Sequence, residues 1–132
     1  MGRPKVLLVD DCKVVHKVVV QMYGDSYDFT CVQSPEAAVT ALLTGESPDV
    51  VLLDVQLGPR LGTELLETLR NHRVVSHVKD LPVVMLTEDR SGAVYEMSMW
   101  LGAVAYVTKP IEYEGLGEAL RSVVAERGRM SA

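Results

Sequence analysis

Acidic, hydroxyl and ammonium side chains stand at the ends of four short apolar runs of this sequence. They are Asp10 and Asp11, Asp54, Thr87, and Lys109. Three clustered carboxylates repel one another unless a hard cation lies between them, and oxygen ligands favour Mg²⁺, for which Mn²⁺ can substitute. A lysine and a threonine can pair with the oxygens of a phosphoryl group. If these five residues meet in space, they fit a metal-assisted reaction at phosphorus.

Short β-branched runs alternate with segments of helical period along the chain. Strands are predicted at Lys5–Val9, Phe29–Val32, Val50–Leu53, Val83–Leu86 and Ala105–Val107. Helices are predicted through Val14–Met22, at Pro35–Leu43, Thr63–Arg70 and Gly92–Leu101, and through Leu116–Val124. This alternation is typical of a parallel sheet covered by helices on both faces, so we expect one doubly wound α/β domain. Residues just past the strand ends then gather along one edge, where such folds usually bind ligands.

Each of the five residues also has a purely structural explanation. An acidic pair after a strand often forms a turn or a helix cap, and Asp54 or Thr87 could likewise cap the helix that follows it. Lys109, followed by a proline, could lie in a solvated turn. The placement of all five residues on strand ends favours a shared site over these separate explanations.

The composition indicates one globular domain, which we assign to residues 1–132 with a core at about residues 5–127. A net charge of -5 argues against direct binding of nucleic acid. No apolar run approaches the length that spans a membrane, and the first residues do not form a signal peptide. We therefore expect a cytoplasmic protein without membrane contact.

The cysteines and histidines do not have the spacing of a metal site. Cys12 and Cys31 lack paired spacing and are expected to be buried, reduced thiols. His16, His72 and His77 share neither a helical face nor a ligand spacing. We expect surface or packing roles for the histidines.

From about Lys5 to Arg127 the chain resembles the response-regulator receiver family of two-component signalling systems. The resemblance rests on an acidic pair, an acceptor aspartate, a threonine, an aromatic residue and a Lys-Pro pair. These are Asp10-Asp11, Asp54, Thr87, Tyr106 and Lys109-Pro110. The resemblance implies a flavodoxin-like sheet with strand order 2-1-3-4-5. It also implies a phosphate acceptor that assists its own phosphorylation and dephosphorylation, and not a conventional enzyme.

The resemblance also assigns roles to the residues of the site. Asp54 would accept a phosphoryl group from the phosphohistidine of a histidine kinase or a phosphotransfer protein. Mg²⁺ would be held by Asp11, Asp54 and the backbone carbonyl of Gln56, with Asp10 acting largely through water. Lys109 would pair with the phosphoryl group. This transfer depends mainly on positioning and electrostatics.

A conformational switch is the second implication of the resemblance. Thr87 would turn toward the new phosphoryl group, and Tyr106 would follow it inward. The face made by the fourth helix, the fifth strand and the last helix would then change and control an output domain or an output protein. A phosphorylation-dependent dimer through this face is a further hypothesis.

The sequence departs from the family pattern at two places, which leaves alternatives open. Glu88 is larger and more acidic than the residue that usually follows the threonine, and Leu57-Gly58 replaces the usual Met-Pro. A degenerate receiver that binds partners without phosphorylation is therefore one alternative. A haloacid-dehalogenase-like phosphatase is a weaker one, because its acid/base aspartate would stand at Gln56.

Overall fold

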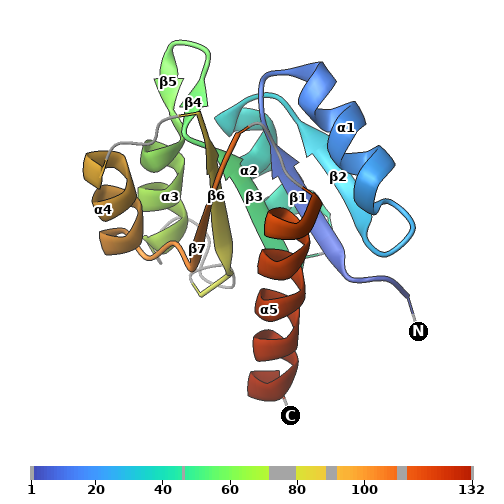
Figure 1. Ribbon diagram of the computed structural model, residues 1–132. Helices are drawn as coiled ribbons and strands as arrows, with labels where there is room; N and C mark the ends of the chain where they lie inside the picture. Colours follow the sequence, from blue (N-terminus) through green and yellow to red (C-terminus); the bar gives the residue numbers. More distant parts are fainter. Residues whose placement is uncertain (1, 46, 72–79, 89–91, 110–112, 132) are drawn as a thin grey trace.

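The computed structural model describes residues 2–45, 47–71, 80–88, 92–109 and 113–131, with the backbone alone at 113–114 and 127–131. Its five-stranded sheet is parallel, with the strand order β2-β1-β3-β6-β7 (Figure 1). The strands are β1 (Lys5–Val9), β2 (Asp28–Val32), β3 (Val50–Asp54), β6 (Val83–Thr87) and β7 (Ala105–Thr108). β4 and β5 form a separate small hairpin, so β6 and β7 are the fourth and fifth strands of this sheet. The predicted order 2-1-3-4-5 is therefore confirmed.

Five helices connect and cover these strands, as the alternating pattern predicted. They are α1 (Lys13–Tyr23), α2 (Pro35–Thr44), α3 (Gly62–Arg70), α4 (Gly92–Trp100) and α5 (Tyr113–Ser131). Ser34 caps the start of α2, since its hydroxyl accepts a hydrogen bond from the Ala37 N–H at 3.1 Å. Among the described helices, none is both long and apolar enough to cross a bilayer.

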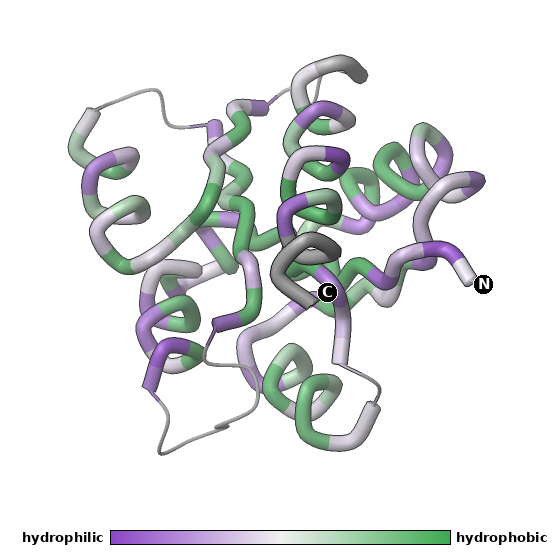
Figure 2. The backbone as a smooth tube through the Cα atoms, turned by 90° about the horizontal axis from the view of Figure 1, so that it is seen from below, coloured by the Kyte–Doolittle hydropathy of each residue, from purple (hydrophilic) through white to green (hydrophobic). Residues whose placement is uncertain are grey.

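Two hydrophobic clusters hold the helices on opposite faces of the sheet. Alternate strand residues point to opposite faces, so Leu7 and Leu53 belong to one cluster while Leu8 and Leu52 belong to the other. The first cluster packs against α2, α3 and α4, and the second against α1 and α5. In Figure 2 the central strands are largely coloured as hydrophobic, as strands buried on both faces must be.

The register of the sheet brings the polar strand ends to one edge. Val9 of β1 pairs with Leu53 of β3, and Asp54 pairs with Leu86 of β6. Asp10 and Thr87 therefore lie at the same edge as Asp54. Residues 72–79, between α3 and β6, lie outside the described residues, and His72 and His77 are among them.

The connection from β3 to α3 contains a small antiparallel hairpin, where we predicted neither a strand nor a helix. Its strands are β4 (Gln56–Leu57) and β5 (Arg60–Leu61). The turn is possible because Gly58 has a φ of 61°, which favours glycine. Strands of two residues are too short to show an alternating pattern, which is why the prediction missed them. An ion pair between Arg60 and Glu36 joins the hairpin to α2.

Candidate functional site

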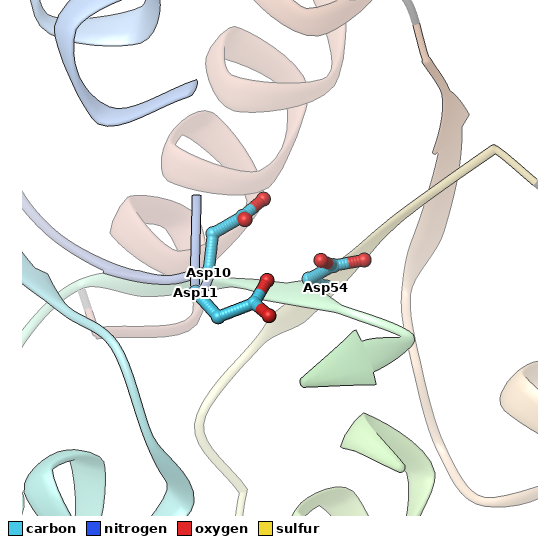
Figure 3. Close-up of side chains that lie close together, drawn as sticks. All are labelled: Asp10, Asp11 and Asp54. Carbon is cyan, nitrogen blue, oxygen red and sulfur yellow. The ribbon is translucent and has the colours of Figure 1, made fainter. Parts of the chain in front are cut away.

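Three carboxylates converge at the carboxyl edge of the sheet. One oxygen from each of Asp10, Asp11 and Asp54 lies within 4.8 Å of the other two. Figure 3 shows the three side chains directed toward a common space, two from the end of β1 and one from the end of β3. Asp10 is fully buried and Asp54 is 6% exposed, whereas Asp11 lies at the surface. The predicted convergence of the acidic residues is confirmed.

Lys109 lies directly past β7 and joins two of these carboxylates. Its Nζ lies 2.8 Å from Asp10 Oδ2 and 3.2 Å from Asp54 Oδ2. Burial alone would lower the pKa of Lys109, but the hydrogen bond to Asp10 and the charge of Asp54 outweigh it and raise the pKa. The lysine is therefore a fixed positive charge at the site. The neighbouring Pro110 lies outside the described residues.

Asp54 is held with one oxygen toward Lys109 and the other toward the backbone. Its Oδ1 accepts a hydrogen bond from the Gln56 N–H at 3.2 Å. Burial and the charge of Asp10 nevertheless raise the pKa of Asp54 from 3.8 to about 6, against the opposing effects of Lys109 and the Gln56 N–H. The ionised form of Asp54 is thus costly unless a further positive charge is present.

The turn between β1 and α1 fixes Asp10 through its backbone. The Cys12 N–H donates to Asp10 Oδ1 at 2.9 Å, and the Asp10 N–H donates to the Val32 carbonyl of β2 at 3.1 Å. Cys12 occupies the N-cap position of α1 and is exposed, so the prediction of a buried thiol there was wrong. Cys31 is partly buried, and both cysteines are free thiols. The Cys12 N–H is a site contact that no side-chain pattern could indicate.

Two glycines of the β3–α3 connection make room for the site. A Cβ atom on Gly62 would lie 1.9 Å from the Asp54 carbonyl oxygen, and the Gly62 N–H donates to the Val55 carbonyl at 2.6 Å. A Cβ atom on Gly58 would lie 3.8 Å from Asp11 Oδ2, so the hairpin turn borders the acidic cluster. Both glycines fall between the predicted strand at Val50–Leu53 and the predicted helix at Thr63–Arg70, but only the fold shows that Gly62 packs against Asp54.

The remaining predicted site residues lie near this cluster in different environments. Thr87 is the buried last residue of β6, and its carbonyl accepts from the Lys109 N–H at 2.6 Å. Tyr106 on β7 is half-buried, and its ring makes an edge contact with that of Tyr95 on α4, with centroids 5.4 Å apart. Glu88 directly follows Thr87 and is exposed. Their roles in switching and in modifying the site remain predictions, as does the metal-binding role of the Gln56 carbonyl.

The donor set fits a hard divalent cation. The three carboxylates can carry more negative charge than the Lys109 ammonium offsets, and burial together with the charge of Asp10 raises the pKa of Asp54. Oxygen ligands of this kind suit Mg²⁺ and Mn²⁺. The phosphatase alternative is not supported, because the Gln56 amide bonds to the carbonyls of Gly58 and Arg60 and offers no acid/base group.

Comparison with known proteins agrees with this geometry. A putative response regulator from Chloroflexus aurantiacus is 26% identical, with 94% of this chain and 99% of that chain covered and a TM-score of 0.85. The chemotaxis protein CheY4 of Vibrio cholerae is also 26% identical, with coverage of 92% and 99% and a TM-score of 0.82. The Mn²⁺-bound form of response regulator Rcp1 shares the fold at 24% identity, with coverage of 92% and 90% and a TM-score of 0.72.

Residues 6–121 match the family described as the response regulator receiver domain. The match spans the sheet, the acidic cluster and Lys109, so the family pattern and the observed site concern the same part of the chain. This chain belongs to the response regulator receiver domain family of two-component signalling.

Proposed function

We propose that Asp54 is the phosphate acceptor of this receiver domain and takes a phosphoryl group from the phosphohistidine of a histidine kinase or a phosphotransfer protein. The observation that carries the proposal is the position of the Asp54 carboxylate, within 4.8 Å of two further carboxylates and 3.2 Å from Lys109 Nζ. A nucleophilic carboxylate beside a lysine and a cation-binding oxygen set is the arrangement that phosphoryl transfer needs.

Each neighbouring residue has a defined task in this proposal. Asp11, Asp54 and the Gln56 carbonyl hold Mg²⁺, while Asp10 acts largely through water. Bound Mg²⁺ supplies positive charge that offsets the charge of the transferring phosphoryl group. Lys109 pairs with a phosphoryl oxygen and exchanges its present contact with Asp54 for that partner. These tasks are electrostatic and need no separate proton-transfer group.

Two observations support the metal and the modifying role of Glu88. The Mn²⁺-bound form of response regulator Rcp1 has the same fold, and the acidic triad here offers oxygen ligands, which suit Mn²⁺ and Mg²⁺. Glu88 is exposed beside Thr87, at the edge of the site. Its negative charge repels an anionic phosphoryl donor and so reduces access or changes the lifetime of the phosphorylated form.

The output of the domain is proposed to pass through the face made by α4, β7 and α5. Thr87 turns toward the phosphoryl group and Tyr106 follows, which shifts a two-state equilibrium. Apolar side chains on and beside α4 support a contact role for this face. Trp100 is 83% exposed, and Tyr95, Met97 and Val104 are about half-exposed. An output domain or protein, or a second phosphorylated copy, binds this face.

The wider context of the proposal follows from the kind of partner it requires. Histidine kinases and phosphotransfer proteins deliver phosphoryl groups on the cytoplasmic side, so we place the domain in the cytoplasm. We assign residues 1–132 to one receiver domain that acts on a protein partner. A direct role in nucleic-acid binding is not part of the proposal, because the net charge is -5.

Phosphorylation of the wild type beside Asp54→Asn tests the proposed function. Both proteins are treated with acetyl phosphate and Mg²⁺ and examined by intact mass. The matched control is Asp25→Asn, which neutralises an exposed aspartate in the turn after α1. We expect the wild type and the control to gain one phosphoryl group and Asp54→Asn to gain none.

A second arm of the experiment separates the proposal from the degenerate receiver. Beryllofluoride with Mg²⁺ mimics the phosphorylated aspartate, so spectral changes at Tyr106 should require both Mg²⁺ and Asp54. No mass gain and no change dependent on Asp54 would favour a receiver that binds partners without phosphorylation. Sedimentation of the beryllofluoride form tests the dimer, and an unchanged monomer would count against it.

A further inference from the structure

Two side chains bind the backbone carbonyls of the turn that carries the acidic pair. His16 Nε2 lies 2.6 Å from the Asp10 carbonyl oxygen, and Gln33 Nε2 donates to the Asp11 carbonyl oxygen at 3.3 Å. His16 comes from the first turn of α1, and Gln33 follows β2 directly. Both carbonyls lie past the end of β1, where the sheet still holds the Asp10 N–H through the Val32 carbonyl. The two side chains add partners for the carbonyls of this turn.

The three carboxylates of the site differ in how they are fixed. Asp10 is held by the Cys12 N–H and Lys109, and Asp54 by the Gln56 N–H and Lys109. Within the described parts of the chain, no such hydrogen bond or ion pair fixes the Asp11 carboxylate. Asp11 is also the exposed member of the triad. The backbone of the turn is therefore the part of Asp11 that the structure holds, through the bond of Gln33 to its carbonyl and that of His16 to the carbonyl before it.

The helix geometry explains why His16 reaches back to Asp10. Side chains on an α-helix tilt toward its N-terminus, and the Cys12 carbonyl accepts the His16 N–H at 3.3 Å at the start of α1. The imidazole can then lie over the preceding turn. A carbonyl partner requires a proton on Nε2, which both the neutral ring in that tautomer and the charged ring provide. The bond therefore does not depend on a change in charge.

We propose that His16 and Gln33 are positioning residues for the acidic pair. They hold the peptide groups of Asp10 and Asp11 so that the Asp11 carboxylate meets those of Asp10 and Asp54. Neither side chain is a ligand in this proposal, and both act through the backbone. The expected effect on Mg²⁺ affinity rests on the proposed function, because that function assigns Mg²⁺ to this site. The expected effect on the order of the turn in metal-free protein does not rest on it.

Four variants test the positioning role. His16→Leu removes the donor at similar volume, whereas His16→Gln keeps an N–H donor of comparable reach. Gln33→Met removes the second donor, and Gln21→Met makes the same change at an exposed position of α1. Calorimetry gives the Mg²⁺ dissociation constant. Hydrogen exchange of the Cys12 amide reports the turn in metal-free protein, because this amide bonds to Asp10.

We expect His16→Leu and Gln33→Met each to weaken Mg²⁺ binding by about threefold to tenfold and to speed Cys12 exchange, as for the loss of one hydrogen bond. His16→Gln and Gln21→Met should stay near the wild type. If His16→Gln and His16→Leu weaken Mg²⁺ binding and speed Cys12 exchange equally, the effect comes from the shape of the side chain and not from the hydrogen bond. That result would overturn the role of His16. Unchanged exchange and affinity in both donor-free variants would overturn the whole proposal.

The readouts keep this inference separate from the proposed function. A wild type that binds no Mg²⁺ would contradict the proposed function, while Cys12 exchange in metal-free protein would still decide whether the two side chains order the turn. If His16→Leu does not fold, Gln33→Met still tests the proposal. Gln33 is exposed, so its replacement does not disturb the core.

Discussion

The Asp54→Asn substitution removes a carboxylate whose ionised form the metal-free fold holds at a cost. Asp54 is 6% exposed, and burial with the nearby charge of Asp10 raises its pKa from 3.8 to about 6. Asparagine keeps an oxygen acceptor for the Gln56 N–H but carries no charge. We therefore expect Asp54→Asn to be more stable than the wild type in metal-free buffer at neutral pH.

The magnitude follows from the difference in pKa between the folded and unfolded states. Each pKa unit corresponds to about 1.36 kcal/mol, so ionised Asp54 costs the folded state about 3 kcal/mol. Because the folded pKa is the higher one, the folded state binds more protons between about pH 4 and pH 6. Stability is therefore lost as the pH rises through about 6. About 2 kcal/mol of this loss falls between about pH 4.5 and 7.5.

Urea unfolding of both proteins at these two pH values measures the effect. In the presence of a chelator, the stability of Asp54→Asn relative to the wild type should increase by about 2 kcal/mol at the higher pH. Other titrating groups are shared and largely cancel in this difference. Excess Mg²⁺ should stabilise the wild type more than the variant, because the cation binds the folded state. A stability difference that stays constant or shrinks as the pH rises would refute the reasoning.

Three further predictions concern packing, a backbone contact and the lysine. Gly62→Ala should lower the free energy of unfolding by about 3 kcal/mol, because its Cβ would lie 1.9 Å from the Asp54 carbonyl oxygen. Gly58→Ala should lower the free energy of unfolding by only about 1 kcal/mol, because a Cβ atom there meets no close atom and only the φ of 61° is unfavourable. Equal urea midpoints for Gly62→Ala and Gly58→Ala would contradict this difference. Arg70→Met loses two bonds to backbone carbonyls and should cost about 2 to 3 kcal/mol by thermal or urea unfolding. Lys109→Met should raise the pKa of Asp54 above about 6 in a metal-free NMR titration, and an unchanged pKa would exclude the lysine as its main counter-charge.

The sequence predicted the sheet and the convergence of the site residues because both depend on local patterns. Fully apolar runs such as Val50–Leu53 mark strands buried on both faces, and the parallel fold then brings Asp10, Asp54 and Thr87 to one edge. The helix predicted at Pro35–Leu43 likewise begins at a local signal, because Ser34 caps it. These features need only periodicity and turn chemistry, which neighbouring residues carry.

The details of the site depend on contacts between residues far apart in the chain. Lys109 and Asp10 are 99 residues apart, and only the fold places Nζ at 2.8 Å from Oδ2. The hairpin at residues 56–61 was missed because its strands are two residues long. The exposure of Cys12 was also missed, because burial depends on packing against other elements. No periodic pattern contains such information.

The sequence alone thus determined which acidic, hydroxyl and ammonium groups can meet at the site, because residue type and position at a strand end are enough to define them. Tertiary structure alone decided how they meet. It set the burial that raises the pKa of Asp54, and it brought His16 and Gln33 to the two carbonyls of the acidic turn. The physical reason is that desolvation and hydrogen-bond geometry depend on the three-dimensional surroundings of a group, which the order of residues specifies only through the completed fold.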